Sequence, residues 1–196
     1  MTADGLIEAL AARRGHFRLE SGHHGELWLD LDALFARPAR LAPFVAQLAE
    51  QLSRCRADVV CGPLVGGAFV AQAVAERLGI EASWTERVAA PSGGGLYAAR
   101  YRVPDGLRDR VRGRSVAVVD DVINAGSATR ATIADLRACD ARPVALGALL
   151  VLGEGAAQLA GNEGLALASV AALPNAIWEP ADCPLCAAGV ELKDRG

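Results

Sequence analysis

The feature that most constrains the fold is an apolar run that ends in two aspartates and passes through a short turn into a helical pattern. Residues 116–119 form the run, Asp120 and Asp121 follow it, and residues 127–139 have helical spacing. A continuous apolar run of this length is typical of a strand buried on both faces. The order of strand, turn and helix therefore indicates one unit of an α/β fold.

Similar units precede and follow this one. A strand is expected to begin at residues 58–61, and the glycine-rich turn at residues 62–67 leads into a helix that ends near Leu78. A short strand is expected around residues 82–84, and residues 143–152 form another apolar run. This alternation predicts an α/β fold with a central, mainly parallel sheet flanked by helices.

The N-terminal part has a different pattern. The first sixteen or so residues look helical, whereas residues 17–35 alternate and place Leu27, Leu29 and Leu31 on one face. With 196 residues and 52% hydrophobic content, one domain with a sizeable core is expected. We divide it into a cap or hood (residues 1–36), an α/β core that starts with an amphipathic helix (residues 37–173), and a tail (residues 174–196).

Charge and composition exclude several classes of partner. The formal net charge of −3 offers no basic field for nucleic acid, and no run approaches the roughly 20 apolar residues of a membrane span. The N-terminus lacks the apolar stretch of a signal peptide. Five cysteines, an odd number and mostly in apolar contexts, do not indicate a secreted disulfide framework. We therefore expect a cytoplasmic protein that binds neither nucleic acid nor membrane.

Residues 116–129 also have the chemistry of a ligand site. Gly126 allows the backbone to approach a ligand, Ser127 and Thr129 offer hydroxyls, and the following helix points unpaired amides and its positive end at the turn. These features suit a monophosphate. Asp120 and Asp121 lie where ligands of open α/β sheets bind, and they can accept bonds from vicinal sugar hydroxyls. The sequence thus predicts a ribose 5-phosphate site. The alternative is a strand that ends in two solvated acids before an ordinary capped helix.

The segment VVDDVINAGSA resembles the signature of type I phosphoribosyltransferases, and that of orotate phosphoribosyltransferase in particular. The resemblance implies a Mg²⁺-dependent homodimer that transfers the 5-phosphoribosyl group between 5-phosphoribosyl 1-pyrophosphate and a nucleobase. It assigns the ribose hydroxyls to Asp120 and Asp121, which are also candidate ligands of Mg²⁺, although this metal binds mainly through phosphate and sugar oxygens. It assigns the 5-phosphate to Asn124, Ala125, Gly126, Ser127, Ala128 and Thr129.

A second glycine-containing turn joins a strand to a helix, so its amides could form a small pocket for pyrophosphate. The resemblance implies that this is the pyrophosphate loop, formed by Gly62, Pro63, Leu64, Val65, Gly66 and Gly67. The alternative is an ordinary glycine-rich strand-to-helix turn. Residues 15–22, together with Asp30, resemble the part of the cap that folds over the base.

The sequence departs from the orotate pattern at three places. Glu20 stands where the family has a lysine, residues 88–101 contain no lysine, and residues 153–155 replace a segment with an acid and an arginine. The three glycines at residues 93–95 still suit a mobile lid. Arg87 is our candidate for pyrophosphate contact and catalysis; the other arginines near this loop are Arg100 and Arg102. These departures leave two alternatives, a transferase for another base and a non-catalytic sensor of phosphoribosyl pyrophosphate.

The tail contains a C-x-x-C pair, Cys183 and Cys186, which could supply two thiolates to a structural zinc. Two ligands do not complete a tetrahedral site. The other two would have to come from another subunit, a histidine, or one of the remaining cysteines, Cys55, Cys61 and Cys139. Unligated thiols packed in the tail are the alternative. The histidines of the cap, His16, His23 and His24, are expected to face solvent.

Overall fold

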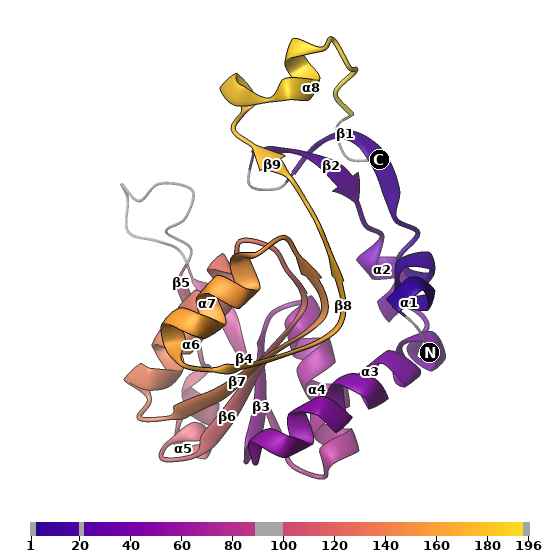
Figure 1. Cartoon of the computed structure of the whole chain (residues 1–196). Helices are drawn as coiled ribbons and strands as arrows, with labels where there is room; N and C mark the ends of the chain where they lie inside the picture. Colours follow the sequence, from indigo (N-terminus) through magenta and orange to yellow (C-terminus); the bar gives the residue numbers. More distant parts are fainter. Residues whose placement is uncertain (1–2, 20–21, 89–99, 194–196) are drawn as a thin grey trace.

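The computed structural model describes residues 3–19, 22–88 and 100–193. Within these residues, a six-stranded sheet has the order β5-β4-β3-β6-β7-β8, and every neighbouring pair is parallel except the antiparallel pair β4 and β5. The predicted α/β class, with a mainly parallel central sheet, is therefore confirmed (Figure 1). The strands are β3 (Val59–Pro63), β4 (Glu81–Val88), β5 (Arg100–Arg102), β6 (Ser115–Ile123), β7 (Arg142–Leu152) and β8 (Ala166–Leu173).

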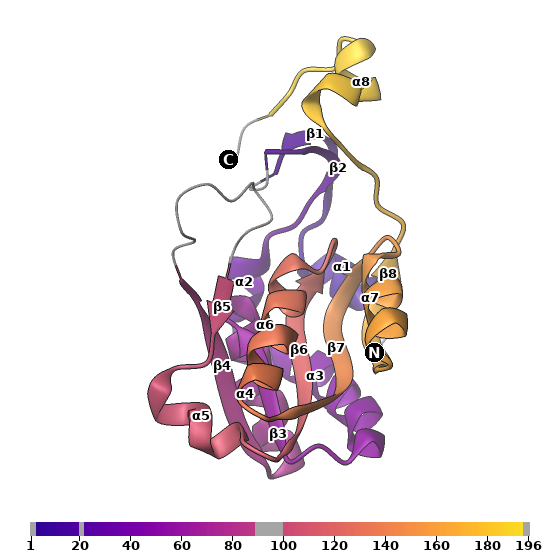
Figure 2. The same ribbon diagram turned by 90° about the vertical axis from the view of Figure 1, so that its left-hand side faces the viewer.

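Helices cover both faces of this sheet (Figures 1 and 2). On one face, α3 (Pro38–Leu52) and α4 (Gly66–Leu78) pack in a core with α1 (Ala3–Ala9) and α2 (Leu31–Phe35). On the other, α5 (Asp105–Val111), α6 (Ser127–Ala138) and α7 (Gly155–Glu163) pack in a second core. The apolar positions of α3 at Leu41, Phe44, Val45 and Leu48 are buried, as their helical spacing predicts.

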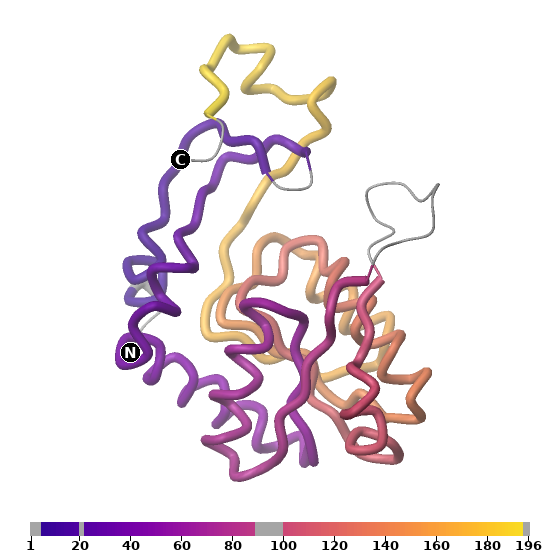
Figure 3. The backbone as a smooth tube through the Cα atoms, turned by 180° about the vertical axis from the view of Figure 1, so that it is seen from behind, coloured from indigo at the N-terminus to yellow at the C-terminus, as the bar shows by residue number. Residues whose placement is uncertain are grey.

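Strands from the N-terminal and C-terminal parts of the chain meet in a separate small sheet. Strands β1 (Arg13–Arg18) and β2 (His24–Trp28) form an antiparallel pair, and the two-residue strand β9 (Ile177–Trp178) adds to β2. The tail continues through η2 (Pro180–Asp182) and α8 (Pro184–Ala187) and returns to β1, where Lys193 exchanges backbone hydrogen bonds with His16 and Arg18. Figure 3 shows the tail over the N-terminal strands, away from the main sheet. From here on, the hood means β1, β2, the described residues that join them, and β9.

Several elements differ from their expected bounds. The first helix ends at Ala9, and Arg13 already starts a strand, since a seven-residue helix is followed by a turn at Ala11 with positive φ. Strand β4 is longer than residues 82–84, because β3 and β5 pair with different parts of it. Strand β6 runs past both aspartates to Ile123, because β7 extends beside it. Helix α7 and strand β8 were not predicted from the sequence. Between β3 and α3 lies a short 3-10 helix, η1 (Ser53–Cys55).

No helix in residues 3–19, 22–88 and 100–193 has the length and apolar character needed to cross a bilayer.

Candidate functional site

The turn between β6 and α6 forms one wall of a pocket of about 200 Å³. Gly126 caps the helix in the left-handed region, with φ of 72°, and its carbonyl accepts a hydrogen bond from the amide of Arg130 at 2.8 Å. A Cβ atom at Gly126 would also lie 3.1 Å from a methyl carbon of Leu159. Glycine is thus required here, because other residues adopt this conformation at a cost. Residues 124–129, Asp120 and Val122 line the pocket from the core, and Leu19, His23 and Ile177 line it from the hood.

Asp120, the first of the two aspartates, lines this pocket, and Asp121 is its neighbour in β6. Asp120 is buried; its carboxylate accepts hydrogen bonds from the amide of Asp121 at 3.0 Å and from the hydroxyl of Thr129 at 3.4 Å. The Asp121 carboxylate accepts the amide of Val122 at 2.7 Å. Burial raises the pKa of Asp120 well above its ordinary value, and the Asp121 carboxylate raises it further. Burial likewise raises the pKa of Asp121. Two desolvated carboxylates side by side are suited to bind hydroxyl donors or a cation.

The loop at residues 62–67 packs directly against these aspartates. A Cβ atom at Gly66 would overlap the Asp121 carboxylate, and one at Gly67 would lie 2.8 Å from Oδ1 of Asp120. A Cβ atom at Gly62 would overlap the carbonyl of Gly67. The absence of side chains at these three positions therefore allows the loop to reach the acid pair. The amide of Leu64 donates to the carbonyl of Thr85 at 2.8 Å, which ties the loop to β4.

A second cleft, of about 810 Å³, opens on the other side of the acid pair. The two cavities share Asp120, Val122 and Ala128 in their walls. The cleft continues along the glycine loop to Arg87 and Tyr101, which are opposite one another in the pair of β4 and β5. A ligand that spans both cavities would therefore place its middle at Asp120 and Asp121 and its ends at the two backbone loops.

The cleft contains more acidic than basic side chains. Among its described lining residues, Arg87 is the one cationic residue, whereas Asp32, Asp120 and Asp121 are acidic. Burial raises the pKa of Tyr101, against the opposing effect of the Arg87 guanidinium. A polyanionic ligand in this cleft would thus meet an unfavourable field unless a cation came with it.

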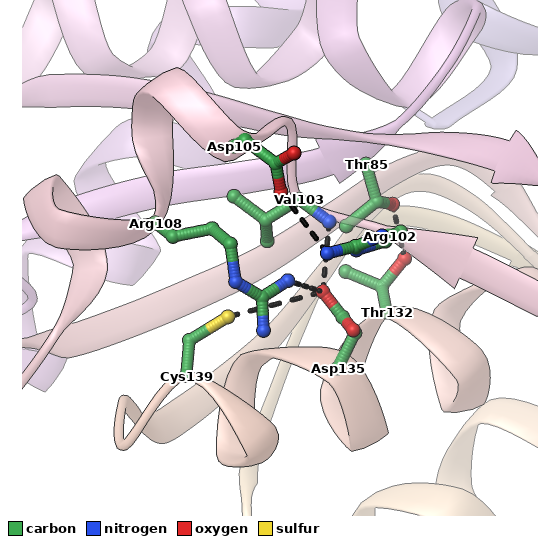
Figure 4. Close-up of polar contacts among 8 residues, drawn as sticks. All are labelled: Thr85, Arg102, Val103, Asp105, Arg108, Thr132, Asp135 and Cys139. Carbon is green, nitrogen blue, oxygen red and sulfur yellow. Dashed lines mark hydrogen bonds and ion pairs between the residues drawn. The ribbon is translucent and has the colours of Figure 1, made fainter.

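Strand β5 and helix α5 are anchored to α6 by a polar network (Figure 4). The Asp135 carboxylate accepts hydrogen bonds from the amide of Val103 at 2.8 Å and from the Arg108 guanidinium at 3.3 Å. Nearby, the hydroxyls of Thr85 and Thr132 lie 2.7 Å apart. The Arg102 guanidinium donates to Asp105 at 3.0 Å. The network thus fixes β5 and α5 to α6, the helix that follows the turn at residues 124–126.

The structure brings together most of the predicted site residues. The acid pair, residues 124–129, residues 63–66 and Arg87 line two adjoining cavities. Gly62 and Gly67 are not among the lining residues, but they allow the loop to approach the acid pair. Asp30 instead caps α2, where its carboxylate accepts the amide of Ala33 at 3.0 Å. Glu20 and the lid proposed at residues 93–95 lie outside the described residues.

Several contributors were not predicted. Tyr101 and Phe35 line the cleft, but no local motif marks them in the sequence. A Cβ atom at Gly155 would overlap the carbonyl of Asn124, so the segment at residues 153–155 supports the turn between β6 and α6. Its glycines were noticed only as a departure from a family pattern.

The expectation for the cap histidines was wrong. His16, His23 and His24 are all buried, because the tail packs over the hood. Cys183 is also buried, and Cys186 lies beside it with His16 and His24. His23 pairs with Glu179 of the tail at 2.8 Å.

Comparisons with known proteins agree with this architecture. Residues 31–163 match a family model described as a phosphoribosyl transferase domain. An orotate phosphoribosyltransferase of Acidithiobacillus ferrooxidans is 32% identical over 96% of this chain and 94% of its own length. One from Caldanaerobacter subterraneus is 29% identical over 93% of this chain and 89% of its own. The crystal structure of orotate phosphoribosyltransferase from Aeropyrum pernix superposes with a TM-score of 0.69 at 27% identity, covering 88% of this chain and 94% of that one.

Proposed function

Because this chain belongs to the phosphoribosyltransferase family, we propose that it transfers the 5-phosphoribosyl group from 5-phosphoribosyl 1-pyrophosphate to orotate. The observation that carries the proposal is the junction of two cavities at one acid pair. A pocket with a helix N-terminus and hydroxyls lies on one side of Asp120 and Asp121, and a glycine loop lies on the other. Phosphoribosyl pyrophosphate has the matching order of monophosphate, ribose and pyrophosphate.

Each end of this ligand has suitable donors. Residues 124–129 would hold the 5-phosphate through backbone amides and through the hydroxyls of Ser127 and Thr129. Asp120 and Asp121 would accept hydrogen bonds from the ribose 2- and 3-hydroxyls. Each hydrogen bond would offset part of the free-energy cost of desolvation, which raises the pKa values of both carboxyls. The amides of residues 62–67 and the Arg87 guanidinium would hold the pyrophosphate.

The reaction is a displacement at the anomeric carbon. A ring nitrogen of the base forms a bond to this carbon as the bond to the pyrophosphate oxygen breaks. Both bonds join atoms of the substrates, so the protein contributes by aligning the reacting atoms, stabilising the leaving group and excluding water. Arg87 carries a fixed positive charge but cannot donate a proton at neutral pH, so its role would be electrostatic.

We propose Mg²⁺ as the metal. The donor set fits, because carboxylate oxygens are hard ligands and the cleft has three acidic residues against Arg87 among its described lining. Asp120 and Asp121 would hold the ion directly or through the sugar hydroxyls. When bound, Mg²⁺ supplies positive charge to the departing pyrophosphate. We further propose a homodimer in the cytoplasm, on the strength of the family resemblance.

Another base is the second candidate function. Arg87 is the one cation among the described lining of the cleft, and it lies on the strand next to the pyrophosphate loop. A carboxylated base would need a cationic partner of its own, since an unpaired carboxylate in a partly closed site incurs desolvation. A neutral base has no such need.

A panel of bases discriminates among the candidates. We expect pyrophosphate release with Mg²⁺, phosphoribosyl pyrophosphate and orotate, at a kcat/KM well above those for uracil, adenine, guanine and hypoxanthine. A higher value for a neutral base would replace orotate by that base. Tight binding of phosphoribosyl pyrophosphate with no turnover for any base would contradict the enzyme and favour the sensor.

A further inference from the structure

Four side chains far apart in the sequence converge above the hood. They are His16 of β1, His24 of β2, and Cys183 and Cys186 at the start of α8. One ligand atom from each lies within 4.8 Å of the other three. Figure 1 shows α8 over β1 and β2.

Four of the six distances between the ligand atoms are close to the edges of a tetrahedron, and all six are at most 4.8 Å. Nε2 of His16 lies 3.1 Å from Nδ1 of His24 and 3.4 Å from Sγ of Cys183. Sγ of Cys186 lies 3.3 Å from the same nitrogen of His24 and 3.8 Å from that of His16. With metal–nitrogen bonds of about 2.0–2.1 Å and metal–sulfur bonds of about 2.3 Å, tetrahedral edges are about 3.3–3.8 Å.

The tautomer of His16 is set by a backbone group outside the cluster. Nδ1 of His16 lies 2.9 Å from the carbonyl oxygen of Val190, and a carbonyl oxygen can only accept a hydrogen bond. Nδ1 therefore carries the proton, and Nε2 presents its lone pair to the centre of the cluster. Such a hydrogen bond on the far nitrogen is the usual support of a metal-bound histidine.

We propose that His16, His24, Cys183 and Cys186 bind a structural zinc ion that ties the tail to the hood. Two thiolates and two imidazoles are a donor set that zinc prefers, and four protein ligands leave no open position for catalysis. Two thiolates would also neutralise the dication, which suits a site where His16 is 1% and Cys183 is 3% exposed.

The proposed ion fixes part of the phosphate pocket. The hairpin between His16 and His24 carries Leu19 and His23, which line that pocket, and the tail supplies Ile177. β9 contributes only two residues to the hood sheet, which is a weak attachment for the tail. By joining the tail to the hood, a zinc ion would keep both segments in position over the phosphate turn.

Metal analysis of the full-length, untagged protein tests the site without relying on activity. We expect about one zinc per chain after purification without chelator. Replacement of zinc by Co²⁺ should produce the visible bands of tetrahedral cobalt and the thiolate-to-cobalt transitions of a two-sulfur site. Less than about 0.1 zinc per chain, with no such spectrum after Co²⁺ addition, would overturn the proposal.

Single-residue variants distinguish zinc bound at this site from metal bound elsewhere on the protein. Cys186→Ser should lose at least about 90% of the zinc, whereas Cys55→Ser, which changes a cysteine outside the cluster, should retain it. His24→Cys keeps a ligand and should retain zinc, since a cysteine sulfur lies only one bond closer to the backbone than Nδ1. If Cys186→Ser does not fold, the cobalt spectrum of the unaltered protein still decides. A Cys183–Cys186 disulfide in the native protein would also contradict the zinc site.

Discussion

The Asp121 carboxylate lies so close to Gly66 that a Cβ atom on this glycine would overlap it. An acid near the end of β6 and the first residue of α4 are therefore in direct contact, although they are far apart in the sequence. Any side chain at position 66 must displace either the acid or the loop.

Gly66→Ala should therefore weaken binding of phosphoribosyl pyrophosphate. We expect a loss of at least about tenfold, or about 1.4 kcal/mol, measured by calorimetry with Mg²⁺. Gly161→Ala is the matched control, because a Cβ atom there would meet nothing within 4 Å. Equal affinities of the two variants would show that the loop does not hold the ligand.

Gly126→Val should abolish binding of ribose 5-phosphate while the fold persists. Valine at φ of 72° is strained, and its side chain would enter the space beside Leu159. The left-handed conformation alone costs about 1–2 kcal/mol, which corresponds to a fall in Tm of about 2–8 °C. Gly106→Val in α5 controls for the new side chain, since a Cβ atom there meets nothing within 4 Å. Binding at full strength by the Gly126 variant would remove the turn from the phosphate site.

Asp120→Asn should stabilise the free protein at neutral pH and weaken its ligand binding. Burial raises the folded-state pKa of Asp120 above its ordinary 3.8, so the folded protein binds this proton more tightly than the unfolded chain. The wild type then loses stability as pH rises from about 4 through the folded pKa, whereas asparagine does not ionise. We expect the Tm of the variant to exceed that of the wild type at pH 7, by about 2–4 °C for each kcal/mol of stability gained.

The difference should shrink as the pH falls toward 4, because the carboxyl of the folded wild type then becomes protonated and no longer carries a buried charge. Asp109→Asn is the control, because the Asp109 side chain is 86% exposed and forms a surface ion pair with Arg112. A variant at position 120 that is less stable than the wild type at pH 7 would refute the assigned direction of the pKa shift.

Arg87→Ala should reduce kcat/KM by about ten- to a hundredfold, since a charge-assisted bond to the leaving pyrophosphate contributes about 1.5–3 kcal/mol. Arg102→Ala should have little effect, because that guanidinium is bound to Asp105 on the surface. Steady-state kinetics with varied phosphoribosyl pyrophosphate measure both. Similar losses in the two variants would mean that the arginines act only through the general field of the cleft.

The core of the fold could be predicted from local patterns because each unit of strand, turn and helix carries its own signal. The segment around Asp120 and Gly126 contains strand, acids, glycine and helix start in one stretch, so the sequence alone indicates a candidate site there. The hood could not be completed in this way. β9 has two residues and is a strand only because β2 lies beside it.

The sequence likewise does not show that His16 and His24 converge with Cys183 and Cys186. A C-x-x-C pair indicates two ligands, but the partners lie at the opposite end of the chain, and no local spacing relates them. The same applies to Tyr101, whose place in the cleft depends on the register of β5 against β4.

Phosphorus NMR of the complete reaction tests the central claim most directly. With Mg²⁺, phosphoribosyl pyrophosphate and orotate, the account predicts that the substrate signals are replaced by those of free pyrophosphate and a nucleotide 5-phosphate in equal amounts. Omission of the base should leave the substrate unchanged. Persistence of phosphoribosyl pyrophosphate with every base, or its loss at the same rate without any base, would contradict phosphoribosyl transfer.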